Sequence, residues 1–326
     1  MKTQLPIRSF IYILFLVGLP VIVSAQSGKV QANGIQIAYE SLGSANKETV
    51  LLISGTNAQL SMWPASFCNH LVKNGYRVIR FDHRDIGLST KFEKAGAPDW
   101  AAIAKAIQEN TTPPLPYTLD DMADDAVGLL DALGIKKAHI VGASMGGMIA
   151  QRVAYNHPEH TLSLASIMAG GGDKKFPLVA KPDAISKIPP PGDPKDTAAY
   201  INREVKSMTI LAGSVFVPDQ KKLLKYVKND VYRSYYPDGL VRQGAASLVG
   251  FYSGRQQQLK TIKVPVVVIH GSEDPLVVPE AGKDVASYIP RAHFELIKGM
   301  GHDLPEPAMK TIVNLIIKNA RKAKSD

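Results

Sequence analysis

The stretch Ala138-His139-Ile140-Val141-Gly142-Ala143-Ser144-Met145-Gly146 decides the fold of this 326-residue chain. An apolar run leads into a Gly-x-Ser-x-Gly pattern, which is typical of a nucleophile elbow: a strand, a sharp turn and a helix that hold a serine hydroxyl at the tip of a sheet. Small residues are needed at both ends of the pattern because the turn brings the backbone close to its neighbours. Ser144 is therefore the candidate nucleophile. The alternative is an ordinary serine in a glycine-rich connection, because a five-residue pattern with two free positions also arises by chance.

Short apolar runs alternate with amphipathic stretches on both sides of this pattern, from residue 35 onward. Such alternation predicts an α/β fold, with a mostly parallel central sheet and flanking helices. The predicted strands cover residues 35–39, 50–54, 77–81, 137–141, 162–168, 264–270 and 293–297. Thr118 is a predicted helix N-cap, and Gly134 is placed to end that helix. A second helix is predicted to leave the elbow and run to about residue 157.

The alternation stops between residues 171 and 262. This block begins within a run of glycines at 170–172 and contains a proline-rich stretch at 188–194. It then turns helical, with Leu224, Val227 and Val231 spaced three and four residues apart among lysines. A block of roughly 90 residues is too long for a plain connection in a compact domain. It is predicted to be a helical lid inserted into a core formed by residues 26–170 and 263–326. A further stretch, 94–116, is predicted to be a mobile loop at the same end of the sheet, because Pro and Gly gather at its ends.

The N-terminus differs from the rest of the chain. Lys2 and Arg8 precede an uncharged apolar run over residues 10–23, which ends in Val23-Ser24-Ala25. This order predicts a signal peptide over residues 1–25, cleaved near Ala25, and hence a secreted or periplasmic mature protein. The alternative is a membrane anchor, but a spanning helix needs about 20 apolar residues and this run is shorter.

Charge and cysteine content narrow the class of partner. The chain carries 38 Lys and Arg against 29 Asp and Glu, a net charge of +9, and its basic residues are dispersed apart from a group near the C-terminus. A dispersed surplus is typical of a solvated surface rather than a nucleic-acid site. The predicted partner is a small-molecule substrate, with no nucleic acid and no membrane span in the mature protein. Cys68 is the only cysteine, which excludes an intramolecular disulfide.

A serine nucleophile needs a base to take its proton, and the base needs an acid to orient it. The candidate base is His302, in a glycine-rich loop after the last predicted strand, and the candidate acid is Asp274, just after the strand before it. Glu273 competes for the acid role, but Asp274 lies deeper in its loop and is followed by Pro275, which stiffens the turn. The order Ser144, Asp274, His302 is that of α/β-hydrolases. Three such residues at three strand ends arise by chance far less often than the elbow alone.

The remaining titratable residues near these positions have structural interpretations. The chain has eight histidines, and most of the other seven, such as His139 within a strand and His157 near a helix end, are interpreted as packing or surface residues. Asp303 adjoins His302, but neighbouring side chains generally diverge. It is interpreted as a loop or helix-start residue.

Acyl transfer also needs hydrogen-bond donors for the oxyanion, preferably rigid backbone NH groups. One predicted donor is the NH of Met145, directly after the nucleophile. The other is the NH of Thr56, in the loop after strand 50–54. Gly55 permits the turn in that loop, and Gly55 or Asn57 is the alternative donor.

With these residues assembled, residues 30 to 320 resemble the α/β-hydrolase superfamily and, within it, the aclacinomycin methylesterase group. Five motifs carry the resemblance: Phe81-Asp82-His83-Arg84-Asp85-Ile86-Gly87-Leu88-Ser89, Gly55-Thr56-Asn57, Val141-Gly142-Ala143-Ser144-Met145-Gly146, Gly170-Gly171-Gly172 and Gly299-Met300-Gly301-His302. The chain departs from these relatives at Asp85, where many have glycine, at Ser54, where many have histidine, and at Lys298, where this group tends to have proline. The signal peptide is a further departure, because the methylesterases it resembles are typically cytoplasmic.

The residues and the resemblance together imply a secreted serine hydrolase that cleaves a carboxylic ester of a small, largely apolar molecule through an acyl-enzyme, without cofactor or metal. One alternative is a carbon-carbon bond hydrolase, perhydrolase or aminopeptidase using the same triad. The other is a non-catalytic binding protein that uses the pocket under the lid. Six aromatic residues of the lid are candidates either for the pocket wall or for the lid's own core: Tyr226, Tyr232, Tyr235, Tyr236, Phe251 and Tyr252.

Overall fold

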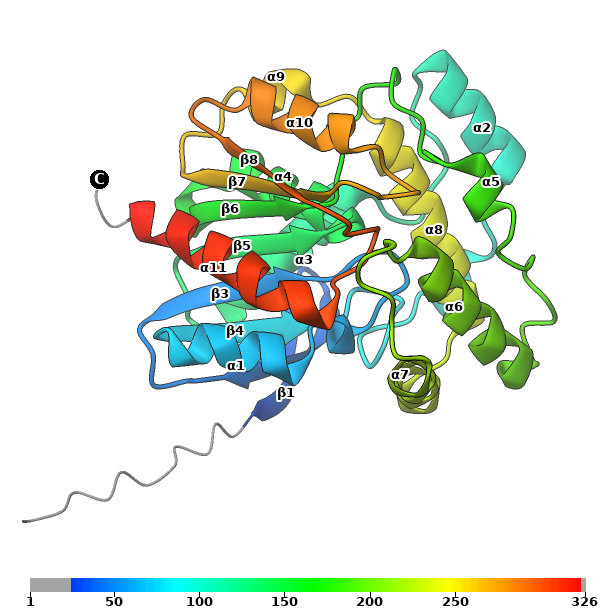
Figure 1. Cartoon of the computed structure of the whole chain (residues 1–326), viewed down its shortest axis with the longest axis horizontal. Coiled ribbons are helices and arrows are strands. Elements are labelled where there is room, and N and C mark those ends of the chain that lie inside the picture. The colour runs from blue at the N-terminus through cyan, green and yellow to red at the C-terminus, as the bar shows by residue number, and fades with distance from the viewer. Residues whose placement is uncertain (1–24, 324–326) are drawn as a thin grey trace, which may run out of the picture.

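An eight-stranded sheet runs through residues 25–323, the part of the chain that this computed structural model describes (Figure 1). The strands are β1 (Gln26–Ala32), β2 (Ile35–Leu42), β3 (Glu48–Ile53), β4 (Tyr76–Phe81), β5 (Ala138–Ala143), β6 (Thr161–Ile167), β7 (Val266–Gly271) and β8 (His293–Ile297). Their order in the sheet is β1-β2-β4-β3-β5-β6-β7-β8. Strand β2 pairs antiparallel with β1 and β4, and all other neighbours are parallel. The predicted α/β fold with a mostly parallel sheet is confirmed.

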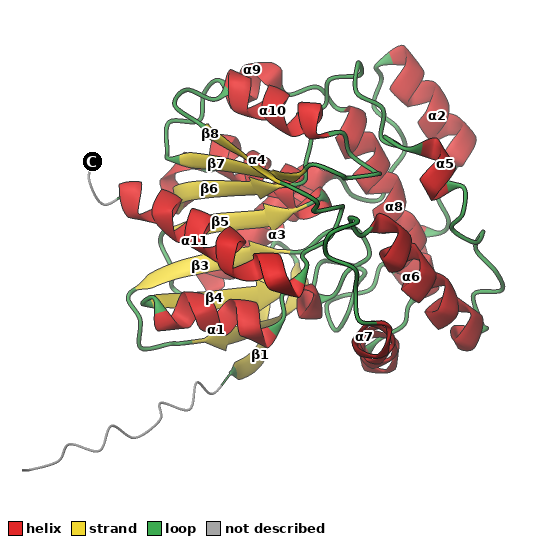
Figure 2. Cartoon of the chain, viewed as in Figure 1, coloured by secondary structure: helices red, strands yellow, loops and turns green. Residues whose placement is uncertain are grey.

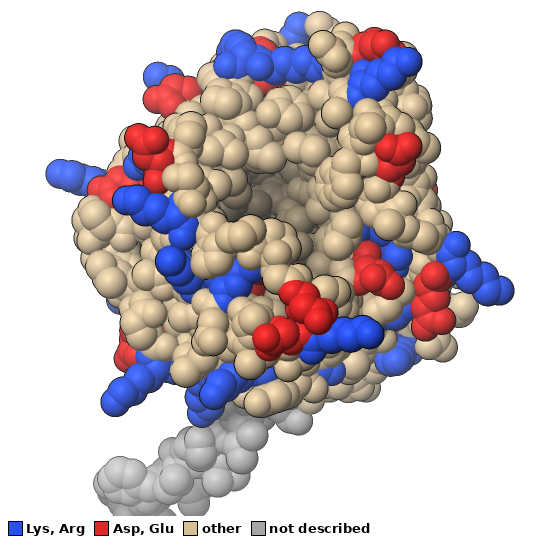
Figure 3. Space-filling model, turned by 90° about the vertical axis from the view of Figure 1, so that its right-hand side faces the viewer, with Lys and Arg blue, Asp and Glu red and all other residues tan. Residues whose placement is uncertain are grey.

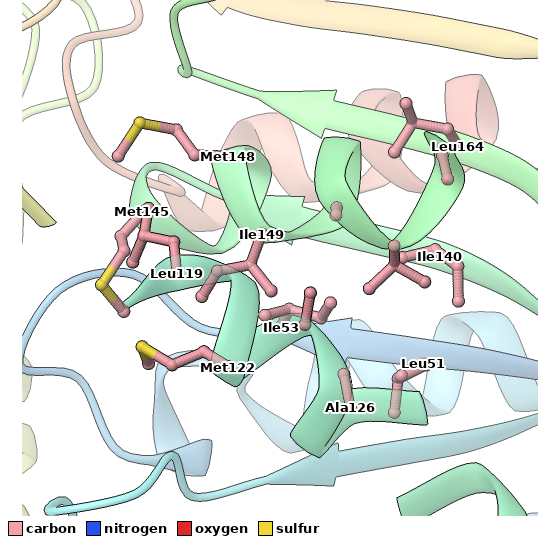
Figure 4. Close-up of a cluster of buried hydrophobic side chains, with 14 of the residues drawn as sticks. Leu51, Ile53, Leu119, Met122, Ala126, Ile140, Met145, Met148, Ile149 and Leu164 are labelled. Atoms are coloured by element: carbon pink, nitrogen blue, oxygen red, sulfur yellow. The ribbon is translucent and has the colours of Figure 1, made fainter. Parts of the chain in front are cut away.

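Helices cover both faces of this sheet, as Figure 2 shows. One face packs against α3 (Leu119–Ala132), α4 (Met145–Asn156) and α10 (Pro279–Tyr288), and the other against α1 (Ala65–Lys73) and α11 (Glu306–Lys322). Figure 4 shows part of the first apolar cluster, in which Ile53 and Ile140 of the sheet lie beside Met122 of α3 and Ile149 of α4. Because both faces are buried, the parallel strands carry nearly continuous apolar runs. Those runs are the signal that made the strands predictable.

Residues 171–262, called the insertion below, connect β6 to β7. They contain α5 (Pro182–Ile185), α6 (Thr197–Leu211), α7 (Gln220–Arg233), α8 (Pro237–Tyr252) and α9 (Gln256–Leu259). In Figure 1, α6 and α8 lie beyond the carboxyl ends of the parallel strands. The predicted helix in this block is α7, where Val227 and Val231 are buried and Leu223, rather than Leu224, is the third buried residue.

A buried ion pair fastens the insertion to the core. Asp85, in the turn after β4, has a φ of 67°, and its carboxylate accepts hydrogen bonds from Nε and Nη2 of Arg242 on α8 at 2.8 and 3.0 Å. Aspartate tolerates this left-handed backbone region better than most residues do. The departure from glycine that the sequence marks at Asp85 therefore has a physical account: the position keeps its backbone conformation and gains a carboxylate that binds α8.

The prediction of a loop over residues 94–116 is wrong at its centre, which forms α2 (Trp100–Glu109). The side chain of Asp99 caps the helix by accepting a hydrogen bond from the NH of Ala102, and Asn110 ends it with a φ of 56°. Ile103 and Ala106 are buried, and α2 contacts α8. Tertiary packing and good capping residues thus outweigh the Pro and Gly residues at the ends of the stretch.

Strand β1 is absent from the sequence prediction. It is an edge strand, most of its residues are exposed or half-buried, and it has no apolar run to reveal it. A two-residue turn, Asn33-Gly34, joins it to β2, and both turn residues have positive φ values of 46° and 75°. This is the backbone that tight hairpins require.

Residues 1–24 of the predicted signal peptide lie outside the described residues, so cleavage near Ala25 stays a prediction. Within residues 25–323, no helix combines the length and the apolar character needed to cross a bilayer. Cys68 is a buried free thiol.

Candidate active site

Ser144 occupies the turn between β5 and α4. Its φ of 56° and ψ of −122° belong to a region that residues other than glycine seldom adopt. The glycines on either side make this turn possible: a Cβ on Gly142 would lie 1.9 Å from the carbonyl oxygen of Gly146, and a Cβ on Gly146 would lie 2.1 Å from that of Ile53. The small residues of the pattern are thus required by backbone contacts, as the sequence analysis inferred.

The structure brings the three predicted triad residues together. His302 Nε2 lies 2.9 Å from Ser144 Oγ, and His302 Nδ1 lies 2.7 Å from Asp274 Oδ2. The three residues come from the turn after β5 and the loops after β7 and β8, which meet at one edge of the sheet. The backbone NH of His302 donates to the carbonyl oxygen of Leu211, the last residue of α6. The insertion therefore supports the histidine loop directly.

The carboxylate of Asp274 is buried and fully engaged. Its Oδ1 accepts hydrogen bonds from the NH groups of Leu276 and Val277, both at 2.8 Å. Its Oδ2 lies 3.2 Å from His270 Nε2 as well as 2.7 Å from His302 Nδ1. Burial alone would raise the pKa of Asp274, but the charge of His302 and the hydrogen bonds of both histidines outweigh it and hold that pKa below its usual range. Asp274 is therefore ionised at neutral pH.

His270 is a site residue that the sequence analysis missed. It is fully buried at the end of β7, and its Nε2 also lies 3.0 Å from the carbonyl oxygen of Val277. It lies four residues before Asp274. The sequence shows only a histidine at the end of an apolar run there, which does not indicate a role in the site. Its side chain positions the acid loop.

Glu273, the competing acid, faces away from the histidine. Its carboxylate accepts hydrogen bonds from the NH of Ser214 at 2.7 Å and from the hydroxyl of Ser214 at 2.9 Å. Ser214 lies in the insertion, between α6 and α7. The two adjacent carboxylates therefore have different partners: Asp274 contacts the imidazole of His302, and Glu273 contacts the insertion.

Asp303 lies in the loop before α11 and is more buried than a loop carboxylate normally is. Its Oδ1 is buried and has no hydrogen-bond partner among residues 25–323. Burial raises the pKa of Asp303 to about 6, against hydrogen bonds from the backbone and the charge of His302, which lower it. The folded protein therefore pays a desolvation cost for this charge at neutral pH.

We expect Asp303→Asn to stabilise the protein at pH 7 but not below pH 4. The folded pKa of about 6 lies above the ordinary 3.8, so the folded state binds more protons between these values and stability falls as pH rises through this window. At about 1.4 kcal/mol per pKa unit, removing the charge should recover up to about 3 kcal/mol at pH 7. Urea midpoints across this pH range measure the effect, with the exposed Asp238→Asn as matched control. A gain independent of pH would contradict the explanation.

The loop after β3 lies against the nucleophile. A Cβ added to Gly55 would lie 3.3 Å from the Cβ of Ser144. The NH of Gly55 is directed at Met62 Sδ, 3.1 Å away, and the NH of Asn57 donates to Gln243 Oε1 at 2.5 Å. Both alternative oxyanion donors are therefore already engaged.

The two favoured donors have no such partner. Within the described residues, neither the NH of Thr56 nor that of Met145 donates to an acceptor of the protein. Met145 is the first residue of α4, and the first NH groups of a helix lack intrahelical acceptors. These two NH groups are free to bind a developing negative charge near Ser144.

Ser144 and Thr56 share the wall of a cavity of about 220 Å³, small for a ligand pocket. The rest of the wall comes from the core and from the insertion: Met148, Met168, Ala169, Gly170, Leu276 and Val277, then Leu178, Gly244, Ser247, Leu248 and Phe251. None of these lining residues is charged. Figure 3 shows a hollow with an uncharged wall on the corresponding face of the molecule. The cavity beside the serine is therefore small and its wall is uncharged.

Of the six aromatic candidates in the insertion, only Phe251 lines this cavity. Tyr226 and Tyr235 pack against the small apolar cluster of α6 and α7, while Tyr232 is 76% exposed. Tyr236 makes its polar contact within the insertion, where its hydroxyl accepts a hydrogen bond from Arg242.

A separate histidine cluster lies at the opposite end of α4 from Ser144. His157, Glu159 and His160 hold metal-ligand atoms within 4.8 Å of one another, and the two imidazoles also face Asp124 and Asp131. The length of α4 separates this cluster from the serine. It supplies no group to the site described above.

Comparison with known families and proteins identifies the family of the chain. A family model described as the alpha/beta hydrolase fold matches residues 48–307. Rhodomycin D methylesterase DauP of Streptomyces sp. is 28% identical over 307 residues, which cover 87% of this chain and 94% of that protein. Rhodomycin D methylesterase DnrP of Streptomyces peucetius shows the same identity and coverage. The resemblance to the methylesterase group is confirmed.

Solved structures share the fold. The meta-cleavage product hydrolase CumD of Pseudomonas fluorescens superposes with a TM-score of 0.69 at 20% identity, covering 91% of this chain and 98% of that one. A thermophilic esterase from Thermogutta terrifontis superposes with a TM-score of 0.63 at 23% identity, covering 91% and 99% of the two chains.

Proposed function

Because the chain belongs to the alpha/beta hydrolase fold family, we propose that it is a serine hydrolase that cleaves a carboxylic ester of a small, largely apolar molecule through an acyl-enzyme. The observation that carries this proposal is the hydrogen-bonded series Ser144, His302, Asp274, with distances of 2.9 and 2.7 Å, at the wall of an uncharged cavity. The methylesterase relatives support ester hydrolysis as the reaction type.

In the first half of the reaction, Ser144 Oγ attacks the ester carbonyl carbon while His302 Nε2 takes the hydroxyl proton. The carbonyl electron pair moves to oxygen, and the NH groups of Thr56 and Met145 donate hydrogen bonds to this oxyanion. The tetrahedral intermediate then collapses: the bond to the alkoxy oxygen breaks, and His302 gives its proton to the leaving alcohol. The acyl group stays on Ser144.

In the second half, water replaces the alcohol. His302 takes a proton from the water as its oxygen attacks the acyl carbon, and the proton returns to Ser144 Oγ when the acyl bond breaks. Asp274 keeps the imidazole in the tautomer with the proton on Nδ1 and stabilises its charged form. One ester and one water thus become one carboxylic acid and one alcohol, with no cofactor or metal.

The cavity supports an uncharged substrate. Its wall combines apolar side chains with the hydroxyls of Thr56, Ser144 and Ser247, so a carboxylate placed there would lose its hydration without gaining a cation. The insertion supplies Leu178, Leu248 and Phe251 to this wall, and we assign it the role of a lid over the site. From the predicted signal peptide over residues 1–25, we propose that this hydrolase acts outside the cytoplasm.

A paired-substrate experiment tests the substrate class. We expect kcat/KM for a p-nitrophenyl ester with a short alkyl acyl chain to exceed that of the same ester ending in a carboxylate by about 100-fold, because a buried unpaired charge costs several kcal/mol. Equal values for the two esters would contradict the apolar substrate class.

A comparison of substrates distinguishes ester hydrolysis from carbon-carbon and amide bond hydrolysis. Vinylogous diketones and proline amides, followed by product analysis, should give slower turnover than the esters. Labelling of Ser144 by a fluorophosphonate, abolished in His302→Ala, distinguishes an enzyme from a binding protein that only uses the cavity.

A further inference from the structure

We propose that Gln243 and Ser247 of α8 are positioning residues that hold the tip of the oxyanion loop, so that the insertion determines how well Thr56 stabilises the transition state. This inference rests on the proposed function, because it takes the NH of Thr56 as an oxyanion donor. It adds a second role for the insertion, beyond forming the cavity wall.

The tip of the loop has a conformation that needs support. The NH of Ala58 donates to the carbonyl oxygen of Gly55 at 3.3 Å, which closes a turn with Thr56 and Asn57 at its centre. Asn57 has a φ of 62°. Asparagine tolerates this left-handed region better than most residues, but the conformation still costs free energy that surrounding contacts offset. The direction of the Thr56 NH is therefore set by whatever holds this turn.

Two side chains of α8 hold it. Gln243 Oε1 accepts a hydrogen bond from the NH of Asn57 at 2.5 Å, and Ser247 Oγ lies 2.8 Å from Thr56 Oγ1. Gln243 and Ser247 are four residues apart, about one helical turn, so they project from the same face of α8. One contact fixes the peptide plane after Thr56 and the other fixes its side chain.

The burial of Gln243 shows what its amide contributes. The residue is fully buried, and its Nε2 has no hydrogen-bond partner within residues 25–323. A buried unsatisfied donor costs about 1–3 kcal/mol, so an apolar residue of similar shape would pack there at lower cost. Among residues 25–323, the hydrogen bond from the NH of Asn57 to Gln243 Oε1 is the one polar contact of this side chain.

The core holds the two ends of the loop, because at its far end the NH of Leu60 donates to Asp82 Oδ1 at 2.9 Å. His83 Nε2 lies 3.0 Å from the carbonyl oxygen of Ser54. Burial lowers the pKa of His83 to about 4, despite the bond to Ser54, so the imidazole is neutral at neutral pH and donates this bond from Nε2. Support for the tip therefore comes from α8, which the buried pair Asp85 and Arg242 fastens in place.

The consequence is a transition-state effect. Removing a whole oxyanion donor lowers kcat by about 100- to 1,000-fold, and misdirecting one should cost part of that. The contact of the Thr56 NH with oxygen strengthens as charge develops, so its loss should appear in kcat and leave KM nearly unchanged.

The test uses the full chain and the alkyl p-nitrophenyl ester. Gln243→Met keeps the length of the side chain but removes the acceptor, and we expect kcat to fall by about 10- to 100-fold with KM within about 2-fold of wild type. Affinity for a trifluoromethyl ketone, which forms a tetrahedral adduct with serine, should fall by the same factor as kcat. Gln243→Glu retains an acceptor oxygen and should restore most of kcat. Ser247→Ala should show the same pattern with a smaller loss.

Asn319→Leu is the matched control. Asn319 is a buried amide on α11 that donates to the carbonyl oxygen of Leu164, so its replacement should lower stability and leave kcat unchanged. If Gln243→Met behaves like this control, with ketone affinity intact, the positioning role is overturned while the hydrolase assignment stands. If Gln243→Met does not fold, Ser247→Ala decides by the same criteria. A wild-type protein without Ser144-dependent turnover would overturn the proposed function and this inference with it.

Discussion

Replacement of Ser144 by alanine is expected to lower kcat for ester hydrolysis by roughly 10⁵- to 10⁶-fold. The substitution removes the attacking oxygen and leaves the NH groups of Thr56 and Met145, and the cavity, as they are. Alanine fits the turn as serine does, because the turn is fixed by backbone contacts such as the 2.9 Å hydrogen bond from the NH of residue 144 to Ile167. Turnover of a p-nitrophenyl ester measures the loss.

Two controls keep this result interpretable. The thermal midpoint of Ser144→Ala should stay close to that of the wild type, which shows that the fold is retained. Ser186→Ala, an exposed serine in the insertion, should keep full activity. If Ser144→Ala retained more than about 1% of wild-type turnover, Ser144 would not be the nucleophile, because the expected residual rate is far lower.

Asp274→Asn is expected to lower kcat by about 10⁴-fold. The amide can still accept hydrogen bonds from the NH groups of Leu276 and Val277 through its oxygen. Its NH2 then faces His302 Nδ1, which must become an acceptor, so the imidazole carries its proton on Nε2 and cannot take one from Ser144. The measurement is kcat at a pH where the wild type is fully active.

Glu273→Gln is the matched control for this loss, since it makes the same chemical change one residue away. Glu273 binds Ser214 and does not reach His302, so we expect kcat to change by less than about 3-fold. A larger loss in Glu273→Gln than in Asp274→Asn would transfer the acid role to Glu273.

Much of the core was predictable from the sequence because buried parallel strands and strand-end loops leave local signals. The apolar runs of β3, β5, β6 and β7 identify strands buried on both faces. In a parallel sheet, loops that follow neighbouring strands meet at one edge, so three polar residues at three strand ends predict a site. The close approach of Gly142 and Gly146 followed from the elbow pattern alone.

What was missed depends on contacts between distant residues or on weak local signals. Gln243 meets Asn57 across 186 positions, and Ser247 meets Thr56 across 191, and no pattern in either segment points to the other. Strand β1 has no continuous apolar run because it is an exposed edge strand, although its Asn-Gly turn was a usable hairpin signal. For α2, the Asp99 cap was present in the sequence and was outweighed by nearby Pro and Gly.

The hydrogen bond from the His302 NH to the carbonyl oxygen of Leu211 limits how the substrate specificity of this protein can change through its insertion. The insertion also binds Glu273 and Asn57, so it cannot be exchanged as an independent unit. A chimera that receives residues 171–262 from a relative would lose the scaffold of three catalytic loops at once. Single replacements at cavity positions such as Leu248 and Phe251 are therefore the simpler route to a new substrate specificity. Replacement of the whole insertion would also require redesign of the core loops that it supports.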